Sequence, residues 1–145
     1  MHIRLRRFYF RVWAPVIVGF AAAGAFLRFQ GANGLAEPAA AVLAPAMLIL
    51  AAGCGIAGPI LYRSLFAYRR RHLAKLPETE FYKFERNQTG IALAAPYLAL
   101  AGFLMQLPRF HMAAVVLMAL YAVYTAYPLE ARIRLDEKIF RIAPL

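Results

Sequence analysis

The residues best suited to bind a ligand are three tyrosines and a threonine near the ends of apolar segments. The spacing i, i+3, i+4 places Tyr121, Tyr124 and Thr125 on one face of a helix. Tyr62 stands at the end of another apolar segment. Tyrosines gather at membrane interfaces, and a buried tyrosine needs a hydrogen-bond partner. We interpret these four residues as the candidate lining of a lipid or quinone pocket, or of a transport pathway.

A second polar group is expected at the opposite ends of the same segments. Glu37 is its only acid, and Arg28 or Arg109 is the expected partner of that acid. We interpret the group as a polar cap at the outer membrane interface; the functional alternative is the mouth of a pathway or a docking site for an external domain. Its members are Arg28, Glu37, Gln106, Arg109 and His111.

Groups for catalysis or for holding a cofactor are few. No pair of the three histidines has the spacing of metal ligands on a helix, and none lies where a buried haem iron would need it. The single cysteine, Cys54, is read as a small buried hydrophobe. Glu85, Glu130 and Tyr127 could act on a lipid at an interface, but basic neighbours favour ion pairs for the two acids. We therefore predict no catalytic residue, no metal and no cofactor.

Long uncharged segments must position these groups. The chain has 145 residues, of which 63% are hydrophobic, whereas a soluble domain is about half apolar. A helix needs about 20 apolar residues to cross a bilayer. The expected spans are 8–29, 37–62, 90–107 and 110–128, with a cytoplasmic loop 63–89 and a cytoplasmic tail 129–145. This pattern predicts a single all-α domain, an integral membrane four-helix bundle of two helical hairpins.

Basic residues alternate along the chain. The arm before the first expected span has four, the first turn one, the loop 63–89 seven, the second turn one and the tail 129–145 four. Lysine and arginine collect on the cytoplasmic side of membrane proteins. The alternation therefore places both termini and the central loop in the cytoplasm. It also explains the formal net charge of +10 without nucleic acid, which we do not expect as a partner.

The second expected span contains small residues and prolines. The spacing i, i+4, i+7 places Ala51, Gly55 and Gly58 on one face, which predicts a close contact with another helix or, alternatively, a hinge or cavity wall. Pro45 and Pro59 are expected to interrupt this helix, since each removes a backbone donor.

Two amphipathic segments follow the hairpins. Basic residues after the second span are expected to contact anionic head groups, at about 1 kcal/mol each, or to serve topology alone. The tail 129–145 is expected to lie on the membrane or on a partner. The basic residues are Arg69, Arg70, Arg71 and Lys75.

The best-supported function from sequence alone is that of a non-enzymatic transmembrane subunit. We expect a scaffold, assembly or accessory role in a larger bacterial inner-membrane complex, because the spans lack charged groups for catalysis or transport. A small oligomeric transporter or channel is one alternative, and a lipid- or quinone-binding membrane enzyme subunit is another. The expected partners are membrane lipids, including anionic head groups, and other membrane subunits or further copies of the chain.

Overall fold

The computed structural model describes residues 2–30, 37–72 and 76–139, and these residues form helices without a β-strand. In chain order the elements are α1 (His2–Gln30), α2 (Glu37–Ala52), the π-helix η1 (Gly53–Ala57), α3 (Gly58–Arg70), α4 (Glu78–Ala92), α5 (Ala94–Leu104), α6 (Arg109–Ala126) and α7 (Glu130–Ile139). The expected all-α fold is therefore confirmed.

Three helical stretches are long enough and apolar enough to cross a membrane. They are His2–Phe29, Ala39–Arg70 and Arg109–Ala126, and the second passes through α2, η1 and α3 without a break. The remaining expected span, 90–107, is divided between the end of α4 and the whole of α5. By length and composition, the described helices thus supply three of the four predicted spans, whereas the fourth is a composite of two shorter helices.

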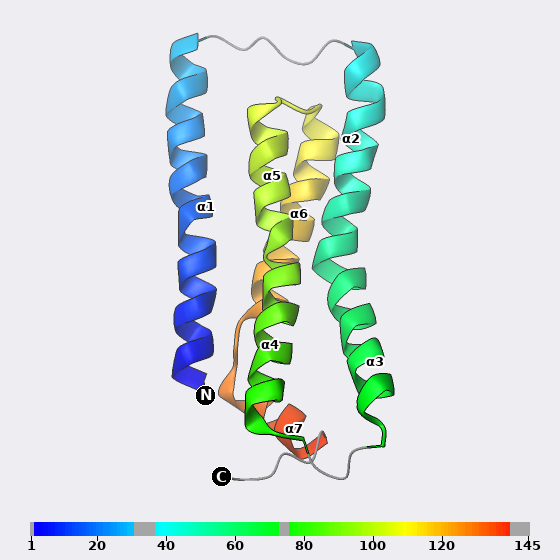
Figure 1. The fold of residues 1–145 in the computed structure, drawn as a ribbon. Coiled ribbons are helices and arrows are strands. Elements are labelled where there is room, and N and C mark those ends of the chain that lie inside the picture. The colour runs from blue at the N-terminus through cyan, green and yellow to red at the C-terminus, as the bar shows by residue number, and fades with distance from the viewer. Residues whose placement is uncertain (1, 31–36, 73–75, 140–145) are drawn as a thin grey trace.

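The division between α4 and α5 lies at Leu93 and has a local cause. Pro96 has no N–H group, and its ring crowds the carbonyl four residues earlier, that of Ala92. The α-helix α4 ends at Ala92, and the N–H of Leu93 donates to the carbonyl of Thr89 at 2.9 Å. The chain then starts again as α5 and continues in nearly the same direction, as the green segments of Figure 1 show.

The π-helix η1 shows how the second long helix accommodates Pro59. This proline cannot donate to the carbonyl of Gly55, four residues earlier. The backbone widens in the preceding turn, where the N–H of Gly58 donates to the carbonyl of Gly53, five residues back. The interruption expected at Pro59 is therefore found just before it. The interruption expected at Pro45 is wrong, because α2 runs through this residue to Ala52.

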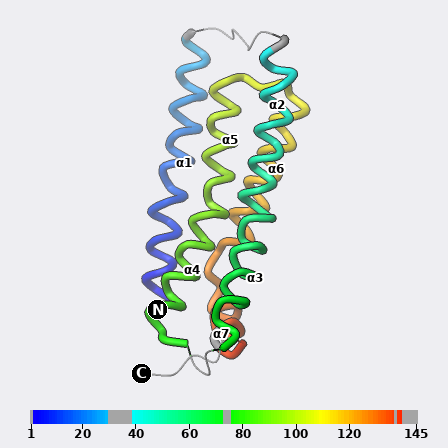
Figure 2. The backbone as a smooth tube through the Cα atoms, turned by 45° about the vertical axis from the view of Figure 1, so that its right-hand side comes forward, coloured from blue at the N-terminus to red at the C-terminus, as the bar shows by residue number. Residues whose placement is uncertain are grey.

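The helices form an elongated bundle in which α4 and α5 occupy the centre. α1 packs against α4 and α5, whereas α2 packs against α5 and α6, and α3 packs against α4. Figures 1 and 2 show α1 and the α2–α3 helix on opposite sides of this centre. The largest apolar cluster joins α2, α5 and α6 through Ala44, Met47, Ala51, Ala99, Leu107, Val115 and Ala119.

The C-terminal helix α7 closes the lower end of the bundle in Figure 1. Its Ile133 is buried in an apolar cluster with Leu5, Leu76, Phe81 and Phe84. The tail was expected to lie on the membrane or on a partner, but its helical part packs on the chain's own helices. The reason is the apolar surface that α1 and α4 present at this end, which Ile133 covers.

The turn after α5 adopts a Schellman motif. The N–H of Leu107 donates to the carbonyl of Gly102, and the N–H of Gln106 to that of Phe103, both at 3.1 Å. This motif requires a left-handed backbone at Gln106, where φ is 51°. Gln106 therefore stands at a position that favours glycine.

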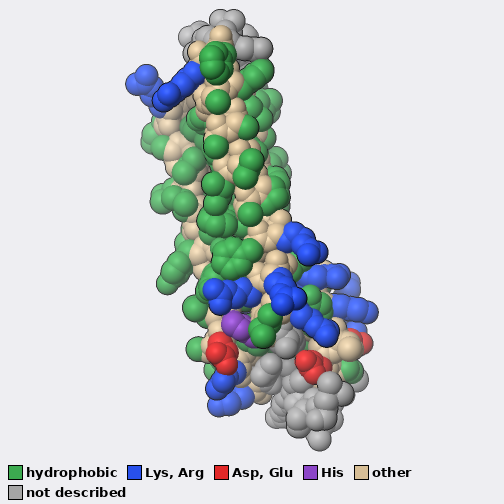
Figure 3. Space-filling model, turned by 90° about the vertical axis from the view of Figure 1, so that its left-hand side faces the viewer, with side chains coloured by type: hydrophobic (Ala, Val, Ile, Leu, Met, Phe, Trp, Pro, Cys, Tyr) green, Lys and Arg blue, Asp and Glu red, His purple; other side chains and the backbone are tan. Residues whose placement is uncertain are grey.

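Side chains are sorted along the long axis of the bundle. Figure 3 shows hydrophobic side chains over the upper and middle parts of one face, and most basic and all visible acidic side chains at its lower end. The first described residue of α1, His2, and the helix α7 lie at this same lower end in Figure 1. On this face, charged side chains thus replace apolar ones toward the lower end of the molecule.

Candidate ligand-binding site

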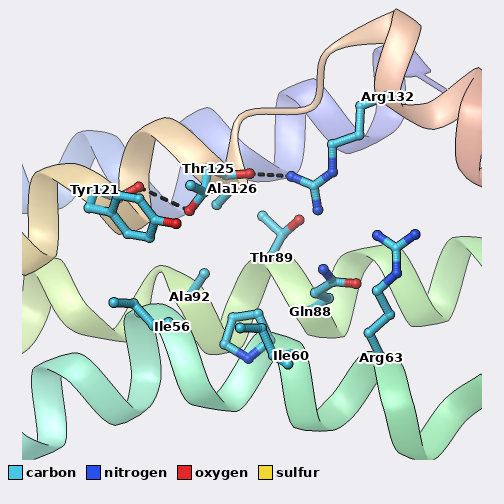
Figure 4. A pocket seen from close by; sticks show the side chains of 12 residues that line it. Ile56, Ile60, Arg63, Gln88, Thr89, Ala92, Tyr121, Thr125, Ala126 and Arg132 are labelled. Carbon is cyan, nitrogen blue, oxygen red and sulfur yellow. Dashed lines mark hydrogen bonds between the residues drawn. The ribbon is translucent and has the colours of Figure 1, made fainter.

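A cavity of about 210 Å³ opens between η1, α3, α4 and α6, beside the start of α7. Figure 4 shows that polar side chains occupy one end and apolar side chains the other. The lining residues are Gly55, Ile56, Pro59, Ile60, Arg63, Gln88, Thr89, Ala92, Tyr121, Thr125, Ala126 and Arg132.

The polar wall comes from one face of α4. Glu85, Gln88, Thr89 and Ala92 follow the spacing i, i+3, i+4, i+7, and all four are buried. A buried polar face is unusual on a helix, because each polar group that is removed from water without a hydrogen-bond partner costs free energy. Gln88 shows this need for a partner, since its buried Oε1 accepts no hydrogen bond from the described residues.

Two buried carboxyl groups lie behind this wall. Asp136 of α7 is 1% exposed and accepts a hydrogen bond of 2.6 Å from Nη2 of Arg63. Nε of Arg132 lies 3.9 Å from the other carboxylate oxygen of Asp136. Glu85 is 3% exposed, and its carboxyl group lies close enough to that of Asp136 for the two groups to interact.

Burial disfavours the charged form of the Glu85 carboxyl group and so raises its pKa. The pKa of Glu85 is raised from 4.5 to about 7, chiefly by loss of hydration. The guanidinium groups of Arg132 and Arg63 lower this pKa, whereas Asp136 adds to the increase. Glu85 lies in α4, before the expected span 90–107 and outside the three membrane-length helices. When Glu85 is protonated, two guanidinium groups face one carboxylate, and the site has one net positive charge.

Arg132 also ties α7 to the end of α6. Its Nη1 donates to the carbonyl of Thr125. The last carbonyls of a helix have no partner within that helix, and the negative end of the helix dipole favours a cation there. Thr125 in turn donates its hydroxyl to the carbonyl of Tyr121 at 2.9 Å. Figure 4 shows both of these bonds beside the cavity.

The apolar end is built where small residues let the helices approach closely. A Cβ atom added to Gly55 would lie 3.2 Å from Cβ of Ala122, so this glycine lets η1 reach α6. One added to Gly58 would lie 2.7 Å from Cγ2 of Ile91. Ala51, the third of the small residues predicted to share one face of this helix, is fully buried. All three lie at contacts between the α2–α3 helix and its neighbours.

The four ligand candidates from the sequence are divided by the structure. Tyr121 and Thr125 line the cavity. Tyr124 is 78% exposed and points elsewhere, although it shares their helix. Tyr62 lies nearer the lower end, where its hydroxyl accepts a hydrogen bond from Asn87 at 3.2 Å and its ring stacks on Phe84.

The outer polar group does not form a connected network in the described part of the chain. Arg28 and Arg109 are exposed, and no hydrogen bond or ion pair between described side chains joins them to Gln106 or His111. The buried Nδ1 of His111 has no hydrogen-bond partner there. The side chain of Glu37, the expected acid, lies outside the described residues.

The basic residues expected at anionic lipid are exposed at the end of α3. Arg70 pairs with Glu80 at 3.0 Å, and the guanidinium of Arg71 lies 4.5 Å from the ring centre of Tyr68. Arg69 is exposed too, and Lys75 lies outside the described residues.

The two acids considered for ion pairing differ. Glu130 forms the expected surface pair, with Arg134 at 2.6 Å. Glu85 faces inward to Asp136 instead, because α7 covers that side of α4.

Sequence reasoning missed most of the polar end of the cavity. The missed residues are Arg63, Gln88, Thr89, Arg132 and Asp136. A signal for two of them was present, because Gln88 and Thr89 share a helix face with Glu85 and Phe81. No family model, curated protein or solved structure matches this chain, so the cavity is the basis for inferring function.

Proposed function

We propose that this chain is a four-span protein of a bacterial inner membrane that binds a membrane amphiphile. Both ends and the central loop lie in the cytoplasm, and the chain acts as a non-enzymatic subunit of a larger membrane assembly. The observation that carries the proposal is the two-ended cavity, with Arg63, Gln88 and Arg132 at one end and Ile56 and Ile60 at the other.

The position of the cavity suits an amphiphile. Arg63 directly follows the expected span 37–62, and α6 ends at Ala126, beside the cavity. The cavity therefore lies at the level where the expected spans end and the basic surface begins. A head group at that level can meet the polar end while its chains remain in the apolar layer.

The exposed apolar edge of the cavity supports entry from the bilayer. Ile60 and Tyr121 line the cavity and still expose about half of their surface. An amphiphile could pass between α3 and α6 without first leaving the membrane. A water-soluble ligand would instead need no such apolar opening.

The subunit role rests on the surface that the spans leave open. In α1, large apolar residues such as Ile17, Val18 and Phe26 are exposed along the length of the helix. Partner helices or lipid can cover this surface, and packing of small and apolar residues drives helix association in membranes. The alternation of basic segments supports the topology, as in the sequence analysis.

Amphiphile binding can be tested by blocking the cavity. We expect Ile56→Trp to fill the space beside η1, whereas Ile49→Trp makes the same chemical change on an exposed part of α2. Each variant is purified in mild detergent, and native mass spectrometry measures bound phospholipid and bound quinone. We expect Ile56→Trp to lose the bound molecule and Ile49→Trp to retain it.

Either of two results would reject the proposal. In the first, no amphiphile binds to the unmodified chain. In the second, the two tryptophan variants bind equally well, which would place bound lipid on the general surface of the helices. Comparable elution and thermal unfolding of the variants provide the control for folding.

A further inference from the structure

We propose that the cavity selects an amphiphile with a singly charged phosphate head group, seated between Arg63 and Arg132. This inference rests on the proposed function, because it names the ligand class of the same cavity. Neutral quinones and zwitterionic lipids would then be poorer ligands.

The two arginines approach the head-group space from different elements. Arg63 belongs to α3 and Arg132 to α7, and their side chains are 37% and 31% exposed. Figure 4 shows both guanidinium groups at the same end of the cavity, with Gln88 and Thr89 beside them. An anion in this space would contact two cations and two neutral polar groups.

The guanidinium groups are held in place before a ligand arrives. Asp136 accepts from Arg63 at 2.6 Å, and Arg132 donates to the backbone of Thr125. The contacts of Arg132 with other described residues use Nη1 and Nε, which leaves Nη2 for a ligand. Arginine presents its donors in a rigid fork that matches phosphate oxygens.

The charge of the site fits one negative charge. Two arginines are offset by Asp136 alone as long as Glu85 is protonated, and the carboxyl pair is buried behind them. A ligand with one negative charge would neutralise the one positive charge that remains on the site. A neutral ligand would leave this positive charge uncompensated, and a doubly charged head group would bring one negative charge too many.

The buried amide of Gln88 adds a preference within the anionic class. Its Oε1 has no hydrogen-bond partner among the described residues and is an acceptor. A head group that has a hydroxyl beside its phosphate would donate to this oxygen. Phosphoglycerol has both features, and its acyl chains would extend past Ile60 and Tyr121 toward the bilayer.

The test compares two lipids that differ only in the head group. The unmodified chain in mild detergent is titrated with phosphatidylglycerol or with phosphatidylcholine of the same acyl chains, and native mass spectrometry gives the bound fraction. Both lipids carry the phosphate, but phosphatidylcholine brings a cation toward the two arginines and lacks the hydroxyl that would donate to Gln88. We therefore expect phosphatidylglycerol to bind about tenfold more tightly.

Arg132→Gln should remove this preference. The variant keeps a hydrogen-bond donor near Thr125 but loses the cation, so we expect the two lipids to bind with similar affinity. Arg134→Gln is the matched control, because Arg134 lies on the same helix and its side chain is 71% exposed. We expect Arg134→Gln to retain the full preference. A second variant, Arg63→Lys, keeps the charge opposite Asp136 and should weaken the preference without loss of folding.

The outcomes separate this inference from the proposed function. If both lipids bind equally and Ile56→Trp abolishes both, the phosphate inference is overturned and amphiphile binding stands. If neither lipid depends on the cavity, both proposals fail. If inorganic phosphate displaces phosphatidylglycerol at equal concentration, the site serves free phosphate and the lipid assignment is overturned.

Discussion

The buried carboxyl group of Glu85 gives a quantitative test of the site. Replacing Glu85 with glutamine removes the ionisable group but keeps the shape and a donor for Asp136. The pKa of Glu85 is raised from 4.5 to about 7, chiefly by loss of hydration. One pKa unit corresponds to about 1.4 kcal/mol, so this shift corresponds to about 3 kcal/mol of unfolding free energy.

The direction of the effect follows from where the group ionises. Below pH 4.5 Glu85 is protonated in both the folded and the unfolded chain, and its ionisation changes nothing. Between pH 4.5 and about 7 it ionises only in the unfolded chain, so the folded chain loses stability as the pH rises. Above about pH 7 Glu85 is ionised in both states, and the stability lost through its ionisation stays constant.

The Glu85→Gln variant should not lose stability in this way as the pH rises, because glutamine does not ionise. The unfolding free energy of the variant relative to the unmodified chain should therefore rise by about 3 kcal/mol between pH 4.5 and pH 7.5. Denaturant unfolding in detergent can be followed by the fluorescence of Trp13, the single tryptophan, whose ring stacks on Tyr9. Glu130→Gln is the control, because Glu130 forms a surface pair with Arg134 and its loss should matter little.

A constant difference between Glu85→Gln and the unmodified chain across this pH range would refute the reasoning. It would mean that water reaches Glu85 in the folded chain and that the carboxyl pair is not buried in solution. The charge balance inferred for the cavity would then also be wrong, because it depends on a protonated Glu85.

Three further predictions concern the turn, the close helix contact and the ligand. Gln106→Gly should raise the unfolding free energy by about 1 kcal/mol, measured by thermal unfolding, because glycine relieves the left-handed backbone at φ 51°. Gly55→Leu should lower it by about 1–3 kcal/mol through collision with Ala122. Gly53→Leu, with open space around it, should show a much smaller loss in the same assay. Phosphatidylglycerol affinity should fall as the pH rises through 7, and Glu85→Gln should abolish that dependence in a binding titration.

Much of the fold could be predicted because its causes are local. Uncharged runs of about 20 residues predict membrane-length helices, and three of these are present. The break within the expected span 90–107 was not predicted, although its cause is local, because the ring of Pro96 crowds the carbonyl of Ala92, where α4 ends. The failure at Pro45 shows the limit of this rule. A proline removes one hydrogen bond, but neighbouring helices can hold the backbone in place.

The ligand-binding candidates could be predicted only in part. Helical spacing predicts that Tyr121, Tyr124 and Thr125 share one face of α6, but it does not say which side of that helix faces α3 and α4. The cavity takes Tyr121 and Thr125 and leaves Tyr124 exposed. That choice depends on the rotation of α6 against its neighbours, and the close approach of Gly55 to Ala122 sets it.

The polar end depends on a contact between distant parts of the chain. Asp136 lies in a tail of mixed charges, where an acid is normally solvated, and only its spacing of three from Ile133 indicates a common face. Ile133 is buried by the apolar residues of α1 and α4, and this packing brings Asp136 to Arg63 and Glu85. The packing of α7 and the charge of the cavity therefore have one origin. A ligand that binds Arg132 would also stabilise α7 on the bundle, because binding to the folded state alone shifts the equilibrium toward that state.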